Sequence, residues 1–209
     1  SARRSLGELN PGIEVEALVT RLHGEAMDAA VARADVVLDC CDNFETRHSV
    51  NRACVAAGVP LVSGAAIRFD GQLAVFDTRR DDSPCYHCLF PEGQDLEEVR
   101  CATMGVFAPL TGIIGTMEAA EALKLAGGFG EPAVGRLLLL DSRSMQWQAI
   151  RVPRDPECPV CSRRPWARTS CAPARTAARG RATRIRARAS VRSSCCSACS
   201  ATTSSAACR

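Results

Sequence analysis

Two hydrophobic periodicities organise residues 1–161. Short apolar runs bounded by turn residues are typical of buried strands, and a period near 3.6 residues is typical of amphipathic helices. Strands are predicted at 13–19, 34–40, 59–67, 136–142 and 145–152, and helices at 1–10, 25–33, 43–58 and 109–128. Alternating strands and helices followed by two antiparallel strands predict an α/β fold: a Rossmann-like sheet with helices on its faces.

Three segments carry more specific expectations. Residues 68–77 ("RFDGQLAVFD") are predicted to form a hairpin, because Asp70-Gly71 is a favoured turn dipeptide. In the helix at 109–128, Gly112 and Gly115 leave room for another element. Its apolar stripe comprises Leu110, Ile113, Ile114, Met117 and Ala120. Residues 78–108 show weak periodicity, which in a stretch of this length indicates a functional or disordered segment.

Charge divides the chain into two parts. All 23 acidic residues lie in 1–161, whereas 162–209 has none and holds 11 of the 26 basic residues, so the parts carry −8 and +11. The overall basic charge therefore gives no reason to expect specific nucleic-acid binding by the folded part. The tail at 162–209 has almost no large apolar residues and is predicted to be disordered. Its alternatives are an Arg-rich arm that binds nucleic acid non-specifically, or a stretch that is not a natural coding frame, which we favour.

Targeting signals and cysteine usage indicate a cytoplasmic protein. No apolar run reaches the roughly 18 residues of a membrane span, and no signal peptide opens the chain. The chain starts at Ser1 in a sequence typical of the middle of a protein, so we expect a fragment. Eight of the 13 cysteines lie in the α/β part, where metal binding or catalysis is favoured over disulfides.

Two Cys-x-x-Cys pairs share one spacing. Cys85 and Cys88 lie in "DSPCYHCLFP", and Cys158 and Cys161 lie in "DPECPVC". Four thiolates fit a closed, structural tetrahedral zinc site, provided that a folded domain brings the pairs together. The alternatives are two unrelated pairs or a disulfide. His87 is interpreted as a solvent-facing residue of the knuckle rather than a fifth ligand.

Two carboxylates follow the predicted strand at 34–40, in "LDCCDNFETR". Ligands of open α/β sheets bind beyond the carboxyl ends of strands, and Asp39 or Asp42 there could hold Mg²⁺ with a nucleotide phosphate. Asp39 could equally have a capping or sheet-edge role. Asp42-Asn43 could equally begin the next helix as its N-cap.

The remaining cysteines of this part are of two kinds. Cys101 stands alone in the long segment, where the neighbouring Arg100 would favour a reactive thiolate; the alternative is a small buried residue. Cys40, Cys41 and Cys54 are interpreted as core residues.

Residues 1–161 closely resemble the MoeB/ThiF/HesA family of ubiquitin-activating-like adenylyltransferases, with MoeB nearest. The resemblance is carried by "VLDCCDNFETRHSVNRACVAAGVPLVSGAAIRFDGQLAVF", "CATMGVFAPLTGIIGTMEAAEALKLAGG" and the two Cys-x-x-Cys pairs. It implies ATP-dependent adenylation of the C-terminal Gly-Gly carboxylate of a ubiquitin-like sulfur carrier of the MoaD or ThiS type. The pathway implied is sulfur transfer for molybdopterin or thiamin, by a homodimer.

The resemblance also implies roles for particular residues. Asp42 matches the family's Mg²⁺ and nucleotide aspartate, and Asn43 lies beside it in the nucleotide pocket. Cys101 matches a cysteine that in some relatives forms a covalent link to the carrier, and we rank it below Asp42. The family's zinc ligands are matched by Cys85, Cys88, Cys158 and Cys161.

The departures from the family pattern concern ATP. The Gly-rich phosphate loop, the acidic residue for the ribose and the Arg and Lys for the phosphates have no counterparts here, and Lys124 is the only lysine. We therefore expect an N-terminally truncated adenylyltransferase that is inactive alone. The alternatives are a zinc-containing fragment that binds the carrier without turnover, and a structural fragment that folds poorly because its sheet edges are exposed.

Overall fold

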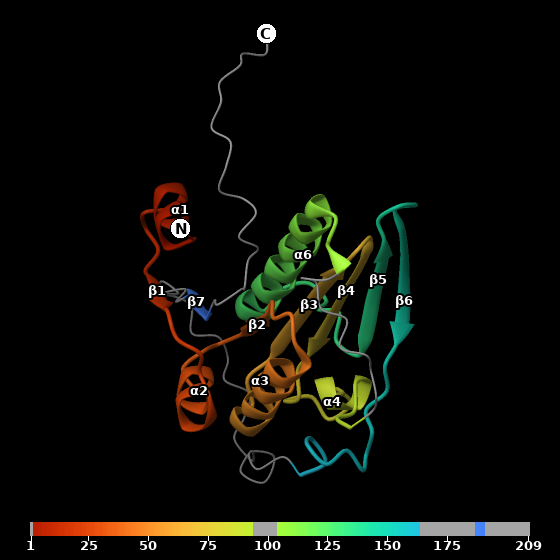
Figure 1. The fold of residues 1–209 in the computed structure, drawn as a ribbon. Coiled ribbons are helices and arrows are strands. Elements are labelled where there is room, and N and C mark those ends of the chain that lie inside the picture. Colours follow the sequence, from red (N-terminus) through yellow and green to blue (C-terminus); the bar gives the residue numbers. More distant parts are fainter. Residues whose placement is uncertain (1, 94–103, 164–186, 191–209) are drawn as a thin grey trace.

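The computed structural model describes residues 2–93, 104–163 and 187–190 (Figure 1). The helices are α1 (Ala2–Leu9), α2 (Gly24–Val31), α3 (Phe44–Ala57), α4 (Tyr86–Leu89) and α6 (Ala108–Gly127). The strands are β1 (Val15–Leu18), β2 (Val37–Asp39), β3 (Leu61–Ile67), β4 (Asp70–Phe76), β5 (Arg136–Asp141), β6 (Gln146–Arg151) and β7 (Ala187–Ser190). All nine elements expected from periodicity are present, with ends that shift by one to three residues.

A mixed five-stranded sheet forms the centre of the molecule, in the order β2-β3-β4-β5-β6. β2 and β3 are parallel and are connected through α3, whereas the other neighbours are antiparallel. The α/β class and the antiparallel strands at the C-terminal end are thereby confirmed. β2 lies at the edge of this sheet, and its Leu38 is exposed rather than buried as expected for 34–40.

Helices cover both faces of this sheet (Figure 1). Successive residues of a strand point to opposite faces, so Val62 and Val75 pack under α6 while Leu61 and Phe76 face α3 and α4. α2 packs against α3 on the latter side. The two helix layers hold the carboxyl end of β2 between α3 and α6, which is where the candidate site lies.

The turn of the β3–β4 hairpin is at Arg68 and Phe69, because Ile67 pairs with Asp70. The predicted turn at Asp70-Gly71 is therefore wrong. The segment before α6 holds the true turn: the Arg68 N–H donates to the Gly105 carbonyl oxygen (2.9 Å), and the Phe107 N–H donates to that of Arg68 (2.7 Å). This support lets Arg68 adopt a φ of 50°.

Gly71 is required for close packing of β4 against α6, and it is not part of a turn. A Cβ at this position would lie 2.8 Å from Ile114 Cδ1 and 2.9 Å from Leu110 Cδ1, both on α6. No described atom lies within 4 Å of a Cβ built at Gly112 or Gly115. Within the described residues, the close approach therefore occurs at a strand glycine, and not at the helix glycines that we expected to provide it.

The buried stripe of α6 differs from the expected one at its second half. Leu110 and Ile114 are buried as predicted, but Ala120 is exposed. Two carboxylates, Glu118 and Glu121, occupy the buried positions that follow. Glu121 accepts hydrogen bonds from Lys124 Nζ and from the Ala133 N–H (2.8 Å), so it is part of the structure around the end of α6.

The tail and the long segment are only partly described. Of the predicted disordered tail, the structure describes residues 162–163 and β7, which pairs in parallel with β1 in a separate two-stranded sheet. The rest of that prediction lies outside the described residues. In the segment 78–108, α4 was not predicted, and residues 94–103 are not described. None of the described helices is both long and apolar enough to cross a membrane.

Gly71→Ala is expected to destabilise the fold by about 1–3 kcal/mol, because the added methyl group overpacks the contact with α6. Gly112→Ala is the matched control. It adds a methyl group to a helix where nothing lies within 4 Å, and should stabilise by about 0.5–1 kcal/mol. Urea unfolding of both variants measures this, and a Gly71→Ala protein as stable as the parent would contradict the packing assignment.

Candidate functional site

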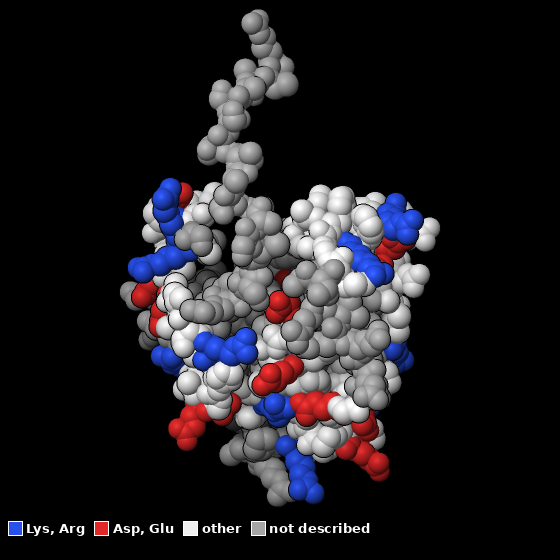
Figure 2. All heavy atoms as spheres, viewed as in Figure 1, with Lys and Arg blue, Asp and Glu red and all other residues white. Residues whose placement is uncertain are grey.

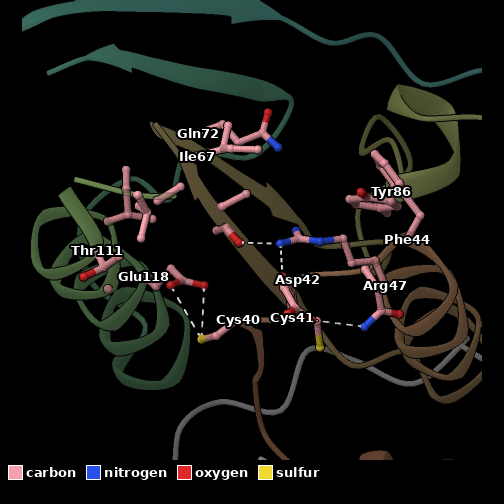
Figure 3. A pocket seen from close by; sticks show the side chains of 17 residues that line it. Cys40, Cys41, Asp42, Phe44, Arg47, Ile67, Gln72, Tyr86, Thr111 and Glu118 are labelled. Atoms are coloured by element: carbon pink, nitrogen blue, oxygen red, sulfur yellow. Dashed lines mark hydrogen bonds between the residues drawn. The ribbon is translucent and has the colours of Figure 1, made fainter. Parts of the chain in front are cut away.

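A pocket of about 620 Å³ opens between the carboxyl end of β2, the start of α3, the β3–β4 hairpin and α6 (Figure 3). Its polar lining comes from side chains on several elements: Cys40, Asp42, Arg47, Tyr86, Thr111 and Glu118. The pocket therefore lies beyond the end of a strand, where α/β sheets bind their ligands. Figure 2 shows Lys and Arg interspersed with Asp and Glu on the face it displays, with no broad area of one sign among the described residues.

A buried ion pair forms the wall of this pocket next to β2. Arg47 Nη1 lies 3.3 Å from Asp39 Oδ2, and the two side chains are 7% and 0% exposed. Ser63 Oγ donates to the same carboxylate oxygen (2.9 Å) and accepts from Arg47 (3.0 Å). Asp39 is thus engaged inside the protein and is not available for a metal ion.

Arg47 also binds backbone groups in the middle of β3 and just past the end of β2. Its Nη2 donates to the carbonyl oxygens of Gly64 (2.9 Å) and Cys41. Burial acts to lower the pKa of Arg47, but the Asp39 carboxylate opposes this and the pKa is raised overall. Sequence reasoning missed Arg47. The available signal was a charged residue four positions after Asn43, on the inward side of a helix.

Asn43 is the N-cap of α3, since its Oδ1 accepts a hydrogen bond from the Thr46 N–H (2.9 Å). The N-cap interpretation is thereby confirmed for this residue. Asp42 precedes it, is exposed, and accepts a hydrogen bond from Asn43 Nδ2 (3.3 Å). Asp42 is accordingly a carboxylate that faces the pocket beside a helix N-terminus, whose dipole favours bound anions.

Glu118 was also missed, although it interrupts an apolar stripe and so left a readable signal. It is 3% exposed, and its carboxylate lies against Gly64, where a Cβ would be 2.4 Å from Glu118 Cδ. Burial raises the pKa of Glu118 to about 7, with a further contribution from the Asp39 carboxylate. At neutral pH this group is therefore poised between its acid and its carboxylate.

The interpretation of Cys40 and Cys41 as core residues is wrong, whereas Cys54 is buried as expected. Because β2 ends at Asp39, both residues lie past the strand and line the pocket. Cys40 Sγ is 3.6 Å from each Glu118 oxygen (Figure 3). Partial burial and the Glu118 charge raise the pKa of Cys40 to about 12, so this residue is a thiol at neutral pH.

The four predicted cysteine ligands are brought together near the C-terminal end of α3, beside Val55. The Sγ atoms of Cys85, Cys88, Cys158 and Cys161 all lie within 4.8 Å of one another. Cys85 lies 3.9 Å from Cys88 and 3.7 Å from Cys158, and Cys88 lies 3.5 Å from Cys161. Ligands 2.3 Å from a tetrahedral ion are roughly 3.8 Å apart, whereas a disulfide is ~2.05 Å long. The donor set and its spacing fit a zinc-type ion.

His87 and Cys101 complete the sequence-predicted residues. His87 is half-buried, so it is not solvent-facing as predicted. It packs against the ring of His48 at a centroid distance of 5.9 Å and is not among the four clustered ligands. Cys101 lies outside the described residues.

Comparisons with known proteins define the class. The chain belongs to the ThiF family, whose profile matches residues 1–160. It is 48% identical over 160 residues to the sulfur carrier protein ThiS adenylyltransferase of Escherichia coli K12, covering 77% of this chain and 62% of that protein. It is 42% identical over 164 residues to the molybdopterin-synthase adenylyltransferase of Salmonella typhimurium, covering 77% and 64%. The chain thus spans less than two thirds of these relatives.

Solved structures support the fold. The crystal structure of E. coli MccB with ATP matches with a TM-score of 0.62 at 21% identity, covering 77% of this chain and 49% of that one. At this identity the match supports the α/β architecture alone.

Glu118→Gln is expected to change how stability depends on pH. The pKa of Glu118 is 4.5 in the unfolded chain and about 7 in the folded protein. Between these two pH values, the folded protein keeps a proton on Glu118 that the unfolded chain releases. Stability should therefore fall as pH rises through this window, by up to about 3 kcal/mol. Urea unfolding at pH 5 and pH 8 should show this decline in the parent and in an exposed control, Glu131→Gln. A decline of equal size in Glu118→Gln would contradict the assignment.

Proposed function

We propose that this chain is part of an adenylyltransferase that activates the C-terminal Gly-Gly carboxylate of a ubiquitin-like sulfur carrier with ATP, in molybdopterin or thiamin sulfur transfer. Two relatives, a ThiS adenylyltransferase and a molybdopterin-synthase adenylyltransferase, support this class of substrate. The observation that carries the proposal is the exposed Asp42 carboxylate at the mouth of the pocket, at the end of β2 and beside the N-terminus of α3.

In this reaction a carrier carboxylate oxygen attacks the α-phosphorus of ATP. An acyl–O–P bond forms, the bond to the β-phosphate oxygen breaks, and pyrophosphate leaves. Mg²⁺, when bound, neutralises phosphate charge, and Asp42 is the residue that we expect to hold it. Asn43 fixes the backbone beside Asp42 through its cap hydrogen bond. Because Asp39 already binds Arg47, the two aspartates have separate roles.

The described part of the pocket offers little positive charge to the phosphates of a nucleotide. Arg47 is the only cation among the described residues that line the pocket, and Asp39 neutralises it. Lys124 is engaged by Glu121 and by the Glu131 carbonyl oxygen (3.1 Å). This distribution favours the second candidate function for the chain by itself, which is binding of the carrier without turnover.

Four further assignments belong to the same proposal. The four clustered cysteines hold a structural zinc ion, and Cys101 remains the candidate for a covalent link to the carrier. The protein is a homodimer. We place it in the cytoplasm, where cysteines are kept reduced.

The function is tested with the full chain and a carrier that ends in Gly-Gly. Titration calorimetry should detect carrier binding that is lost when the two glycines are removed, while ATP–pyrophosphate exchange stays at background. Mn²⁺-ATP binding, followed by electron paramagnetic resonance, should weaken about tenfold or more in Asp42→Ala and stay unchanged in Asp35→Ala, an exposed aspartate outside the pocket lining.

Each alternative has its own result. Carrier binding that is equally strong when the C-terminal Gly-Gly is removed would rule out the proposed substrate. Exchange by the chain alone, abolished in Asp42→Ala, would support the function and contradict the expected inactivity. Equal nucleotide binding in both aspartate variants would remove Asp42 from the site.

Zinc binding is tested by elemental analysis. We expect about one zinc per chain, its loss in Cys158→Ser, and its retention in Cys40→Ser, which removes a thiol outside the cluster. Cys158→Ser should also unfold more readily, because binding of a structural metal contributes directly to folding free energy. Zinc retained at full occupancy in Cys158→Ser would contradict a four-cysteine site.

A further inference from the structure

We propose that the four-cysteine cluster positions the wall of the pocket, and that Asn51 and Tyr86 form the connection. The inference rests on the proposed metal centre and does not require the proposed adenylation. It makes Tyr86 a positioning residue that acts through Arg47. The metal then has a second role beyond folding, which is to determine the geometry of a ligand site at the other end of α3.

One face of α3 runs from the pocket to the cysteines. Arg47, Asn51 and Val55 follow one another at intervals of four residues, so they share this face. Arg47 lines the pocket, while Val55 packs in a buried cluster with Cys85, Cys158 and Cys161. At 1.5 Å per residue, the two ends of this face are roughly 12 Å apart.

Asn51 lies in the middle of this face of α3, between Arg47 and Val55, and its side chain binds the segment that carries Cys85 and Tyr86. It is 1% exposed, and both ends of its amide are used. Its Nδ2 donates to Cys85 Sγ (3.7 Å), and its Oδ1 accepts from the Tyr86 N–H (2.9 Å). A thiolate ligand and the residue after it are thus bound to one side chain of α3. Groups that orient metal ligands in this way commonly affect metal affinity.

Tyr86 carries the connection from the cluster to the pocket wall. It is 2% exposed, follows a metal ligand directly, and still lines the pocket. Its ring is packed edge-on against His48 and Phe76, at centroid distances of 5.2 Å and 6.0 Å, so it cannot move independently. Figure 3 shows it beside Arg47. Burial raises the pKa of Tyr86 to about 12, although the Arg47 charge acts in the opposite direction.

The Tyr86 side chain lies next to the Arg47 guanidinium. Its hydroxyl is buried and has no hydrogen-bond partner of good geometry among the described residues. Arg47 in turn holds the carboxyl end of β2 against the middle of β3 through Asp39, Ser63 and Gly64. If the loop that carries Cys85 and Cys88 relaxes without metal, Tyr86 moves with it. The Arg47 guanidinium then loses the packing that holds it in place on that side.

Reciprocity supplies a test without nucleotide or carrier. If the metal positions Arg47, a change at Arg47 must alter metal affinity, although its side chain is bonded to no cysteine sulfur. Zinc affinity is measured by competition with a chromogenic chelator. Arg47→Lys should bind zinc about tenfold more weakly, whereas Arg52→Lys, the same change on the outer side of α3, should match the parent.

A spectroscopic measurement follows Tyr86 directly, because it is the only tyrosine in the chain. Incorporated 3-fluorotyrosine gives one ¹⁹F resonance. We expect chelation of zinc to shift this resonance, and Arg47→Lys to shift it in the zinc-loaded protein. Ser63→Ala, which removes a hydrogen-bond partner of Arg47 on the side away from the cysteines, covers the case in which Arg47→Lys fails to fold, and should weaken zinc binding about threefold.

Several results would overturn the inference. The inference is wrong if the Arg47→Lys protein is folded, as judged by circular dichroism, and binds zinc with the same affinity as the Arg52→Lys protein. A ¹⁹F resonance that does not change when zinc is removed would overturn it as well. If Arg47→Lys does not fold, parental zinc affinity in Ser63→Ala would overturn it. A chain that binds no zinc overturns both this inference and the metal centre, but leaves the adenylation proposal standing, since the assay contains neither of its substrates.

Discussion

The buried pair of Asp39 and Arg47 is the interaction on which the site depends. A guanidinium at 7% side-chain exposure requires partners for its charge and its donors. Asp39, Ser63 and the carbonyl oxygens of Cys41 and Gly64 provide them. These partners come from β2, from β3 and from the turn that enters α3. One side chain therefore fixes the carboxyl end of β2 against the middle of β3 and the start of α3, and the pocket is the space beyond the end of β2.

Because Asp39 is bound to Arg47, the acidic residues around the pocket have different roles. Asp39 is committed to structure, which leaves Asp42 as the exposed carboxylate at the helix N-terminus. Glu118, on the opposite helix, keeps a raised pKa because it is buried near the Asp39 charge. The pocket thus contains carboxylates in three different environments. Only the most exposed one is suited to a hydrated metal ion, since Mg²⁺ retains several of its waters.

Features encoded within a few residues could be predicted from the sequence. The two cysteines of each pair are only three residues apart, and Asn43 caps the helix that directly follows it. The wrong predictions all depended on contacts with distant segments. Asp70-Gly71 has a turn composition, but α6 requires a glycine there for packing. Cys40 was expected inside because its strand was predicted to be buried and to reach residue 40, yet β2 ends at Asp39 and lies at the sheet edge. Arg47, Glu118 and Tyr86 form a site only once α3, α4 and α6 have been placed around the sheet.

The position of β2 at the sheet edge has a consequence for how copies of the chain meet. An edge strand presents free backbone N–H and C=O groups that can pair with another chain. Here Leu38 adds exposed apolar surface to that edge. The exposed carboxylates of Asp35 and Asp42 lie on either side of it, so two identical edges repel each other as they approach. Salt screens such repulsion, with a Debye length of about 10 Å at 0.1 M. Added salt is therefore expected to reduce the barrier to pairing of two β2 edges.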